Sequence, residues 1–280
     1  MTKITLLGTG GGRHSTMFQA RSTGGFLLET DNVRIHMDPG PGALTNMCQI
    51  GYDLRTTDAV MISHSHPDHY SDAEVVIEGM TYGGWRKRGS LYGSVSVMEG
   101  YEGLGPCISG YHQRLPTEKH TMRPGDRYTI GDVVIDITRS LHNDPTTVGY
   151  KCHTPDGIFS YVTDTTYTDE IADQYRGSKV LFLPITTPDD KRIKGHMCTE
   201  DAITFMRRIK PELTVFIHLG IVLLKHDPAA QAAYAERESG VKTLSGEDLT
   251  VLNMSDLSIS ALTAKRPDWN DIWNLEEEEE

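Results

Sequence analysis

The sequence predicts an α/β protein in which two β-sheets face each other and helices cover their outer surfaces. Short apolar segments bounded by glycine and turn residues dominate the first third of the chain, two hairpin patterns follow, and three segments carry helix-capping signals. With 280 residues the chain is long enough to bury the core of one large domain or two small ones. No repeat and no linker rich in Pro, Gly or Ser divides it. We therefore expect one domain over residues 1–265 and an acidic tail over residues 266–280 that is disordered at its end.

The predicted strands are apolar runs that end at turn residues. A hairpin over residues 126–140 should turn at Gly131-Asp132, and a second over residues 148–164 should turn at the Pro-Asp-Gly sequence that ends at Gly157. The remaining predicted strands, including two that are apolar enough to be buried on both faces, cover residues 3–8, 24–29, 33–38, 59–64, 179–185 and 213–218.

Three helices are predicted from their capping residues. Ser71 is the expected N-cap of the first, and Thr199 is the expected N-cap of the second, which has acidic residues in its first turn and basic residues in its last. Asp227 is the expected N-cap of the third, with Pro228 at the first helical position. The three segments are residues 71–80, 199–210 and 227–240.

Composition restricts the partners of the protein. The net charge is -12, part of it from the run Glu276–Glu280, and such an acidic balance does not favour extended nucleic acid, whose phosphates need clustered Lys and Arg. No apolar stretch approaches the ~20 residues of a membrane span, and the N-terminus lacks a signal-peptide pattern, so we expect a cytoplasmic protein without membrane contact. One basic segment, Trp85–Gly89, is either a solvated loop or a surface that faces substrate.

Metal-ligand residues crowd into six consecutive positions, from His64 to His69. His64, His66, Asp68 and His69 follow an apolar run directly, and imidazole nitrogens and carboxylate oxygens are the donors that divalent metal sites use. A loop that leaves a strand end can turn such side chains inward while the strand fixes its position. This density indicates a metal site rather than surface histidines.

Three further candidates recur in the same context downstream. His142, Asp164 and His218 each follow an apolar segment that is typical of a strand. A single histidine at a strand end is more often structural than a ligand. The repetition, together with the dense cluster, indicates a set of ligands large enough for two metal ions.

Six motifs in this order resemble those of a known family. They are LLGTGGG from Leu6, IHMDPGPG from Ile35, SHSHPDH from Ser63, LHNDPTTVGY from Leu141, SYVTDT from Ser160 and FIHLG from Phe216. From about Lys3 to Met254 the chain resembles metallo-β-lactamase-fold hydrolases, in the branch similar to RNase Z and the cyclic-phosphate phosphodiesterases. The resemblance implies a four-layer αβ/βα sandwich with the site at one edge, between the sheets.

The resemblance also implies roles for the candidate residues. Asp38 would be a buried aspartate that braces the metal-binding loops. The ligands of the first ion would be His64, His66 and His142, those of the second Asp68, His69 and His218, and Asp164 would bridge both ions. The expected cofactors are two Zn²⁺ ions, with Mn²⁺ and Fe²⁺ as alternatives that suit the same donors.

The chemistry implied is hydrolysis. Two divalent ions about 3.5–4 Å apart can hold a hydroxide between them and polarise the bond under attack. Asp68 would orient the attacking water and His196, which precedes the helix before the His218 strand, would be the general acid. The resemblance is weaker at His196, because Met197 stands where the family usually has a small hydroxyl residue. The alternative for His196 is a loop histidine that caps a turn.

The resemblance favours a phosphodiesterase that acts on a small or nucleotide phosphodiester. Processing of tRNA is less favoured, because the chain lacks the glycine-rich basic arm with which RNase Z grips tRNA. A lactone, thioester or β-lactam hydrolase is the first alternative, and a non-catalytic metal-binding protein is the second. Flavin-dependent di-iron reductases are disfavoured, because they need an acid at the position of His66. The turn Gly8–Gly12 is either a tight turn beside the site or a cradle for an anionic group. The resemblance to this family also implies a homodimer.

Overall fold

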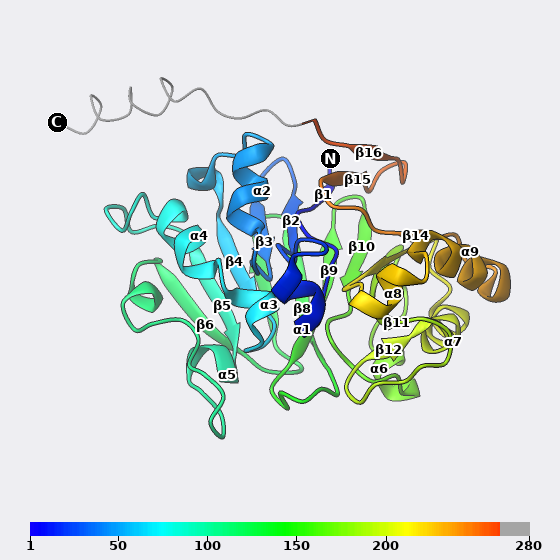
Figure 1. The fold of residues 1–280 in the computed structure, drawn as a ribbon. Helices are drawn as coiled ribbons and strands as arrows, with labels where there is room; N and C mark the ends of the chain where they lie inside the picture. Colours follow the sequence, from blue (N-terminus) through cyan, green and yellow to red (C-terminus); the bar gives the residue numbers. More distant parts are fainter. Residues whose placement is uncertain (264–280) are drawn as a thin grey trace.

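Two β-sheets pack face to face at the centre of the molecule (Figure 1). The computed structural model describes residues 1–263, so the predicted acidic tail over residues 266–280 lies outside the described residues. Helices cover the outer face of each sheet, and the predicted four-layer αβ/βα sandwich is confirmed. The extent of the domain, residues 1–265, stays a prediction.

The strands of each sheet follow a mixed order. The first sheet has the order β16 (Ile259–Ala261), β15 (Thr250–Asn253), β1 (Lys3–Leu6), β2 (Phe26–Glu29), β3 (Arg34–Met37), β4 (Ala59–Ile62), β5 (Ser90–Ser94) and β6 (Glu118–Met122). The second has the order β14 (Thr243–Ser245), β13 (Leu213–Ile217), β11 (Val180–Thr187), β10 (Gly157–Tyr161), β9 (Val148–Thr154), β8 (Val133–Arg139) and β7 (Arg127–Ile130), and β12 (Met197–Cys198) also pairs with β11.

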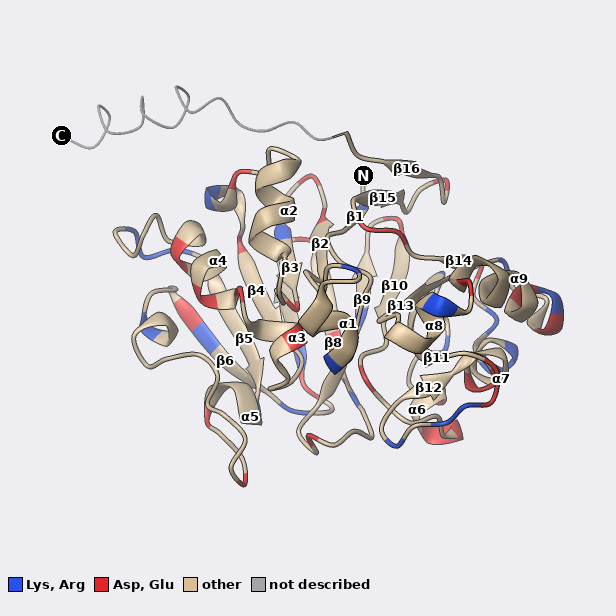
Figure 2. Ribbon diagram, viewed as in Figure 1, with Lys and Arg blue, Asp and Glu red and all other residues tan. Residues whose placement is uncertain are grey.

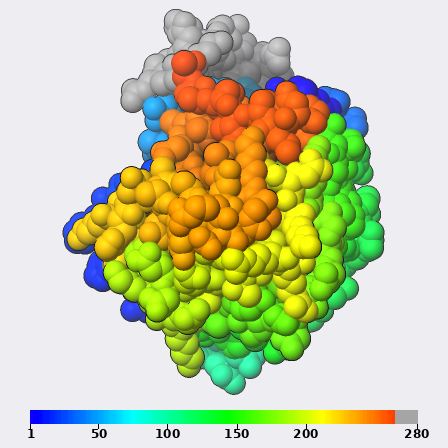
Figure 3. Space-filling model, turned by 90° about the vertical axis from the view of Figure 1, so that its right-hand side faces the viewer, coloured from blue at the N-terminus to red at the C-terminus, as the bar shows by residue number. Residues whose placement is uncertain are grey.

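The helices form the two outer layers. On the side of the first sheet lie α2 (Ala43–Gln49), α4 (Ala73–Met80) and α5 (Val95–Met98). On the side of the second lie α6 (Asp169–Asp173), α7 (Thr199–Ile209), α8 (Ile221–Lys225) and α9 (Pro228–Ser239). The short helices α1 (Arg13–Phe18) and α3 (Pro67–Tyr70) and the 3₁₀ turns η1 (Leu54–Thr56) and η2 (His112–Arg114) complete the set. Figure 3 looks at the side that α9 covers, with the C-terminal strands above it.

The central strands are buried on both faces, which explains their continuous apolar sequences. In β4, Ala59 and Met61 lie in the core between the sheets, whereas Val60 and Ile62 lie in the core beneath the helices of the first sheet. All four side chains are fully buried. Successive side chains of β4 therefore point to opposite faces of the sheet and pack into two separate cores.

Parallel pairing brings the loops of the site to one edge of the molecule. In the first sheet β3, β4, β5 and β6 are parallel, and in the second β10, β11 and β13 are parallel. Strand β8 runs in the direction of β10 because both are antiparallel to β9, which lies between them. The residues that follow β8, β10 and β13 therefore share an edge of the second sheet, and the turn after β4 meets them there.

Two predicted N-caps are wrong by one residue. Helix α7 begins at Thr199 and Cys198 is its N-cap. Asp201 accepts a hydrogen bond from the backbone N–H of Cys198 at 3.3 Å, so the capping partner comes from inside the helix. Helix α4 has Asp72 as its N-cap, because Ser71 ends α3 and donates its hydroxyl proton to the carbonyl of a preceding turn at 2.7 Å.

The third predicted cap is confirmed. Asp227 precedes Pro228 at the start of α9, and its carboxylate accepts hydrogen bonds from the N–H groups of Ala229 and Ala230 at 3.1 and 3.2 Å. Gly240 ends the helix in the left-handed conformation, with φ of 73°. Helix α1, which directly follows the glycine turn, was not predicted.

The basic segment Trp85–Gly89 is a structural loop far from the predicted ligands. The guanidinium of Arg88 pairs with Asp58 at 2.9 Å, and Lys87 donates a hydrogen bond to the carbonyl of Arg114 at 2.6 Å. Asp58 directly precedes β4, whereas His64 follows its other end, so this loop lies at the opposite end of the strand (Figure 2). A substrate-facing role for this segment is therefore disfavoured. None of the helices within residues 1–263 combines the length and the apolar character of a membrane span.

We expect Phe182→Ala to lower the free energy of unfolding by about 3–5 kcal/mol, because it opens a cavity between the sheets. The Phe182 ring is fully buried and packs edge-on against Phe26 and Phe159 at centroid distances of 5.0 and 4.9 Å. Denaturant unfolding of the metal-free protein measures the change. Phe18→Ala is the control, because Phe18 is 73% exposed and its truncation should cost less than about 0.5 kcal/mol. Equal effects of the two substitutions would contradict this description of the core.

Candidate metal centre

The first part of the site is the turn that leaves β4. Ser63 and His64 continue the strand direction, and Pro67 starts the one-turn helix α3 with His66 as its N-cap. The backbone N–H of His69 donates to the carbonyl of His66 at 2.9 Å. The helical turn therefore brings Asp68 and His69 to the same site as the two histidines that precede it.

Asp38, which follows β3, braces this turn. Its buried carboxylate accepts hydrogen bonds from the backbone N–H of Ser63 at 2.7 Å, from the Ser63 hydroxyl at 2.6 Å and from the Tyr161 hydroxyl at 2.8 Å. It also lies 2.9 Å from Nδ1 of His69. Because a carboxylate only accepts, His69 must donate from Nδ1 and keep the lone pair of Nε2 for the site.

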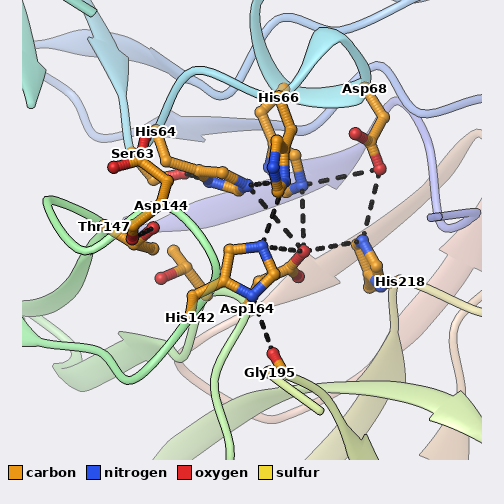
Figure 4. Close-up of polar contacts among 12 residues, drawn as sticks. Ser63, His64, His66, Asp68, His142, Asp144, Thr147, Asp164, Gly195 and His218 are labelled. Carbon is orange, nitrogen blue, oxygen red and sulfur yellow. Dashed lines mark hydrogen bonds and ion pairs between the residues drawn. The ribbon is translucent and has the colours of Figure 1, made fainter. Parts of the chain in front are cut away.

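His64, His66 and His142 meet at one point (Figure 4). Nδ1 of His66 lies 3.1 Å from Nε2 of His64 and 3.0 Å from Nε2 of His142. Asp164 Oδ2 lies 3.8 Å from the His64 nitrogen and 3.6 Å from the His142 nitrogen. These four residues come from three segments, those after β4, β8 and β10.

A second group forms around Asp68, His69 and His218. Oδ2 of Asp68 lies 3.7 Å from Nε2 of His69 and 3.3 Å from Nε2 of His218. Oδ2 of Asp164 lies 3.7 and 3.2 Å from the same two nitrogens. The Asp164 carboxylate therefore lies next to both groups. The seven predicted ligands are thus brought together.

Hydrogen bonds behind the rings fix which nitrogens face the site. Nδ1 of His142 donates to the carbonyl of Gly195 at 2.8 Å, which leaves its Nε2 with a lone pair. Nδ1 of His64 lies 2.9 Å from the Ser63 hydroxyl, whose own proton goes to Asp38. His64 must therefore donate from Nδ1 and also keeps the lone pair of Nε2.

The residues fit divalent metal ions. Three buried atoms at the meeting point have no hydrogen-bond partner among the described residues: Nε2 of His69, Nε2 of His218 and Oδ1 of Asp164. Unpartnered buried polar atoms are costly, and two lone-pair nitrogens and a carboxylate oxygen are metal donors. The spacing of about 3 Å between ring nitrogens is near the ~3.3 Å edge expected for nitrogens bound tetrahedrally at 2.0–2.1 Å.

The electrostatics of the site support the same conclusion. Burial would raise the pKa of Asp164, but the neighbouring rings of His218, His196 and His69 outweigh it, and the pKa lies well below its usual value. Burial lowers the pKa of His64 well below its usual value, aided by His69 and His142. Burial alone would lower the pKa of His218, yet Asp164 and Asp68 raise it to about 9. The carboxylates thus attract positive charge to this point, which bound cations would supply.

Sequence reasoning missed a second brace, Asp144. Its buried carboxylate accepts from the Ser65 N–H at 3.1 Å, from the Ser65 hydroxyl at 2.8 Å, from the Thr146 N–H at 2.9 Å and from the Ser96 hydroxyl. Ser65 stands between two predicted ligands, and Asp144 lies two residues after His142. The carboxylate therefore ties the His142 loop to the histidine turn. Its signal in the sequence was an aspartate two residues beyond a predicted ligand.

The turn Gly8–Gly12 lies against the site. The N–H of Gly12 donates to Asp68 Oδ2 at 2.9 Å. A Cβ on Gly11 would lie 2.1 Å from the ring of His218, so the close approach of the turn requires glycine. These contacts favour the tight turn beside the site over the anion cradle.

The structure places His196 at the edge of the ligand groups. Its ring centroid lies 4.9 Å from that of His142 and 5.5 Å from that of His218, and its Nδ1 lies 3.7 Å from Asp164 Oδ2. The side chain is 16% exposed. Burial lowers the pKa of His196 to about 4, so the ring is neutral at pH 7 and carries one N–H. Its role in catalysis stays a prediction.

We expect Asp38→Asn to weaken metal binding by about 10–100-fold, because the amide N–H₂ would face Nδ1 of His69 and favour the tautomer that lacks a lone pair on Nε2. Competition with a metal chelator, followed by metal analysis, measures the change. Asp58→Asn is a matched control at the other end of β4 and should retain wild-type affinity. Equal metal affinity of the Asp38→Asn variant and the wild type would contradict the bracing role.

Comparisons with known proteins identify the family. The family described as Beta-lactamase superfamily domain matches residues 33–219. An uncharacterized protein of Methanocaldococcus jannaschii is 36% identical over 86% of this chain and 91% of its own length. Ribonuclease Z of Methanopyrus kandleri is 28% identical over 54% of this chain, and the match spans half of that protein.

A solved structure agrees with this assignment at the level of the fold. The crystal structure of a diphosphatase from the PhnP family is similar with a TM-score of 0.66 at 17% identity, and the match covers 95% of this chain and all of that one. The fold, the family match and the ligand cluster lead to one conclusion: this chain belongs to the metallo-β-lactamase superfamily, as a metal-dependent hydrolase related to ribonuclease Z.

Proposed function

We propose that this protein is a dinuclear metal-dependent phosphodiesterase that acts on a small or nucleotide phosphodiester. The observation that carries the proposal is the position of Asp164 Oδ2, within 3.8 Å of ring nitrogens from both ligand groups. His64, His66 and His142 would hold one ion and Asp68, His69 and His218 the other. We propose Zn²⁺, with Mn²⁺ and Fe²⁺ as the alternatives that the same donors accept.

Bound divalent ions in such a site supply an activated water at neutral pH and polarise the phosphoryl group. The chain's own residues position the reactants. Asp68 is held through Oδ2 by the Gly12 N–H and would orient the attacking water. His196 lies at the open edge of the site, where its single N–H would stabilise charge on the leaving oxygen or transfer its proton to that oxygen.

The named relatives favour phosphorus over carbon as the centre under attack. One is a ribonuclease, and the structurally similar protein is a diphosphatase. Both enzymes break a bond between phosphorus and oxygen. This similarity supports a phosphoester substrate here, although the ribonuclease match spans only half of that protein.

Two exposed cations next in sequence to residues that contact the site suit an anionic substrate. Arg13 follows Gly12, which binds Asp68, and Lys194 precedes Gly195, which binds His142. Both side chains are exposed, and neither forms an ion pair with a residue within the described part of the chain. Their chain neighbours Gly12 and Gly195 contact Asp68 of one ligand group and His142 of the other, in a protein whose net charge is -12. A compact anion is therefore favoured over extended nucleic acid.

A lactone or thioester hydrolase is the alternative function, because the same ions would polarise a carbonyl group. The exposed Arg13 and Lys194 favour the phosphoester, since a lactone needs no cations beyond the metals. A non-catalytic metal-binding role is less supported, because the ligand set is complete. A cytoplasmic location and a homodimeric state stay predictions.

We expect the metal-replete protein to hydrolyse bis(p-nitrophenyl) phosphate, and Asp164→Ala to lower kcat/KM by at least about 100-fold, because the variant lacks the carboxylate shared by both groups. Release of p-nitrophenol measures turnover, and metal analysis accompanies each assay. Asp31→Ala, at an exposed turn, is the control and should match the wild type. An inactive wild-type protein with its metals in place would shift support to lactone and thioester substrates.

We expect His196→Ala to lower kcat by about 100-fold or more for a phosphodiester with a poor leaving group, because such leaving groups need a proton or a hydrogen bond. The metal content should stay at the wild-type level. Steady-state kinetics on diphenyl phosphate, with metal analysis of the same samples, checks both expectations. Unchanged turnover would remove His196 from the reaction.

A further inference from the structure

We propose that Thr186 is a positioning residue that links the ligand His218 to His196 and holds the His196 proton on Nε2. The inference rests on the proposed function, because it specifies how His196 is prepared for substrate. It concerns a residue of β11 that carries no metal-ligand chemistry of its own.

The geometry places one hydroxyl between two rings. Thr186 Oγ1 lies 3.1 Å from Nδ1 of His218 and 3.3 Å from Nδ1 of His196. The two rings are nearly parallel, with an interplanar angle of 20° and centroids 5.5 Å apart. Thr186 is only 8% exposed, so water competes little for these hydrogen bonds.

The direction of each hydrogen bond follows from the ligand role of His218. A ligand nitrogen needs its lone pair, so Nε2 of His218 is unprotonated and its Nδ1 donates to Thr186. The hydroxyl has one proton, which remains available for Nδ1 of His196. His196 then accepts at Nδ1 and carries its proton on Nε2.

A competing interaction with Asp164 would favour the other tautomer of His196. Asp164 Oδ2 lies 3.7 Å from Nδ1 of His196, and a carboxylate there would favour the proton on Nδ1. That distance exceeds a hydrogen bond, whereas the Thr186 contact at 3.3 Å lies close to its upper limit. Nε2 of His196 has no hydrogen-bond partner among residues 1–263, so it is free to donate to a bound substrate.

The strand is built to present this hydroxyl. The register between β11 and β12 shifts between Ile185 and Thr187, so Thr186 stands at a bulge. Bulges redirect a side chain without breaking the sheet. Ile185 remains in the helix-side core, and Thr186 contacts the site.

The test compares Thr186→Val, which removes the hydroxyl at nearly constant shape, with Thr186→Ser, which keeps it. Thr214→Val is the matched control, because Thr214 is a buried threonine of the neighbouring strand β13 whose hydroxyl has no hydrogen-bond partner within residues 1–263. Two-bond ¹H–¹⁵N NMR of the zinc-loaded full chain reports each histidine tautomer, and His196→Gln assigns the signal.

We expect the Nε2–H tautomer of His196 in the wild type, Thr186→Ser and Thr214→Val, and a shift toward Nδ1–H in Thr186→Val. Nδ1–H in the wild type would overturn the proposal. An unchanged His196 tautomer in Thr186→Val would also overturn it. This holds even if that variant has lost zinc, because Thr186 would then support only His218.

Kinetics provide a second readout. Relative to the wild type, Thr186→Val should lose about 10-fold more kcat on diphenyl phosphate than on bis(p-nitrophenyl) phosphate, whose leaving group needs little assistance. Thr186→Ser should stay within about 3-fold of the wild type on both esters. Equal losses on the two esters would overturn the positioning role. A wild type inactive on both would count against the phosphodiesterase proposal, and the tautomer measurement would still decide the role of Thr186.

Discussion

The burial of three aspartates beside five imidazole rings is the constraint on which the site depends. Asp38, Asp68 and Asp164 bring negative charge into a poorly solvated interface between two sheets, where an uncompensated carboxylate is strongly unfavourable. Asp38 is compensated by four hydrogen-bond donors. The other two have few such donors and face ring nitrogens. Their compensation requires cations, which explains why the site is suited to metal ions.

The arrangement of the strands determines where the candidate ligands lie, and buried hydrogen bonds determine how their side chains are oriented. Ligands from four strand ends meet at one edge because the relevant strands run in the same direction. Asp38 and Asp144 then act from two sides: one orders the turn through Ser63, the other through Ser65. Backbone strain accompanies this convergence, since Asp38 and His218 both adopt left-handed conformations with φ of 52°. Such conformations persist where the surrounding structure determines them strongly.

The two ends of the first sheet differ in the residues that their loops carry. At the carboxyl ends of its parallel strands lie the ligand loops, with the exposed cations Arg13 and Lys194 nearby. At the other end, Lys87 and Arg88 are occupied with backbone carbonyls and with Asp58. In the proposed function, Arg13 and Lys194, which lack such partners within residues 1–263, would attract the substrate. This division would allow an acidic protein to bind an anionic substrate.

The sequence by itself determined the family, the identity of the seven candidate ligands and the strands that end at them, because hydrophobic periodicity and the spacing of His and Asp depend on nearby residues. It did not predict β5, β6, β12, β14, β15 and β16. It also placed the caps of α7 and α4 to within one residue, and missed by one because Asp201 of α7 accepts from Cys198 and because Ser71 ends α3. Only the tertiary structure decided which nitrogen of each ring faces the site, since this depends on Asp38, Ser63 and Gly195. The links from Thr186 to His218 and from Asp144 to Ser65 likewise join residues that are 32 and 79 positions apart. Contacts of this range arise from the pairing of sheets and cannot be inferred from local patterns.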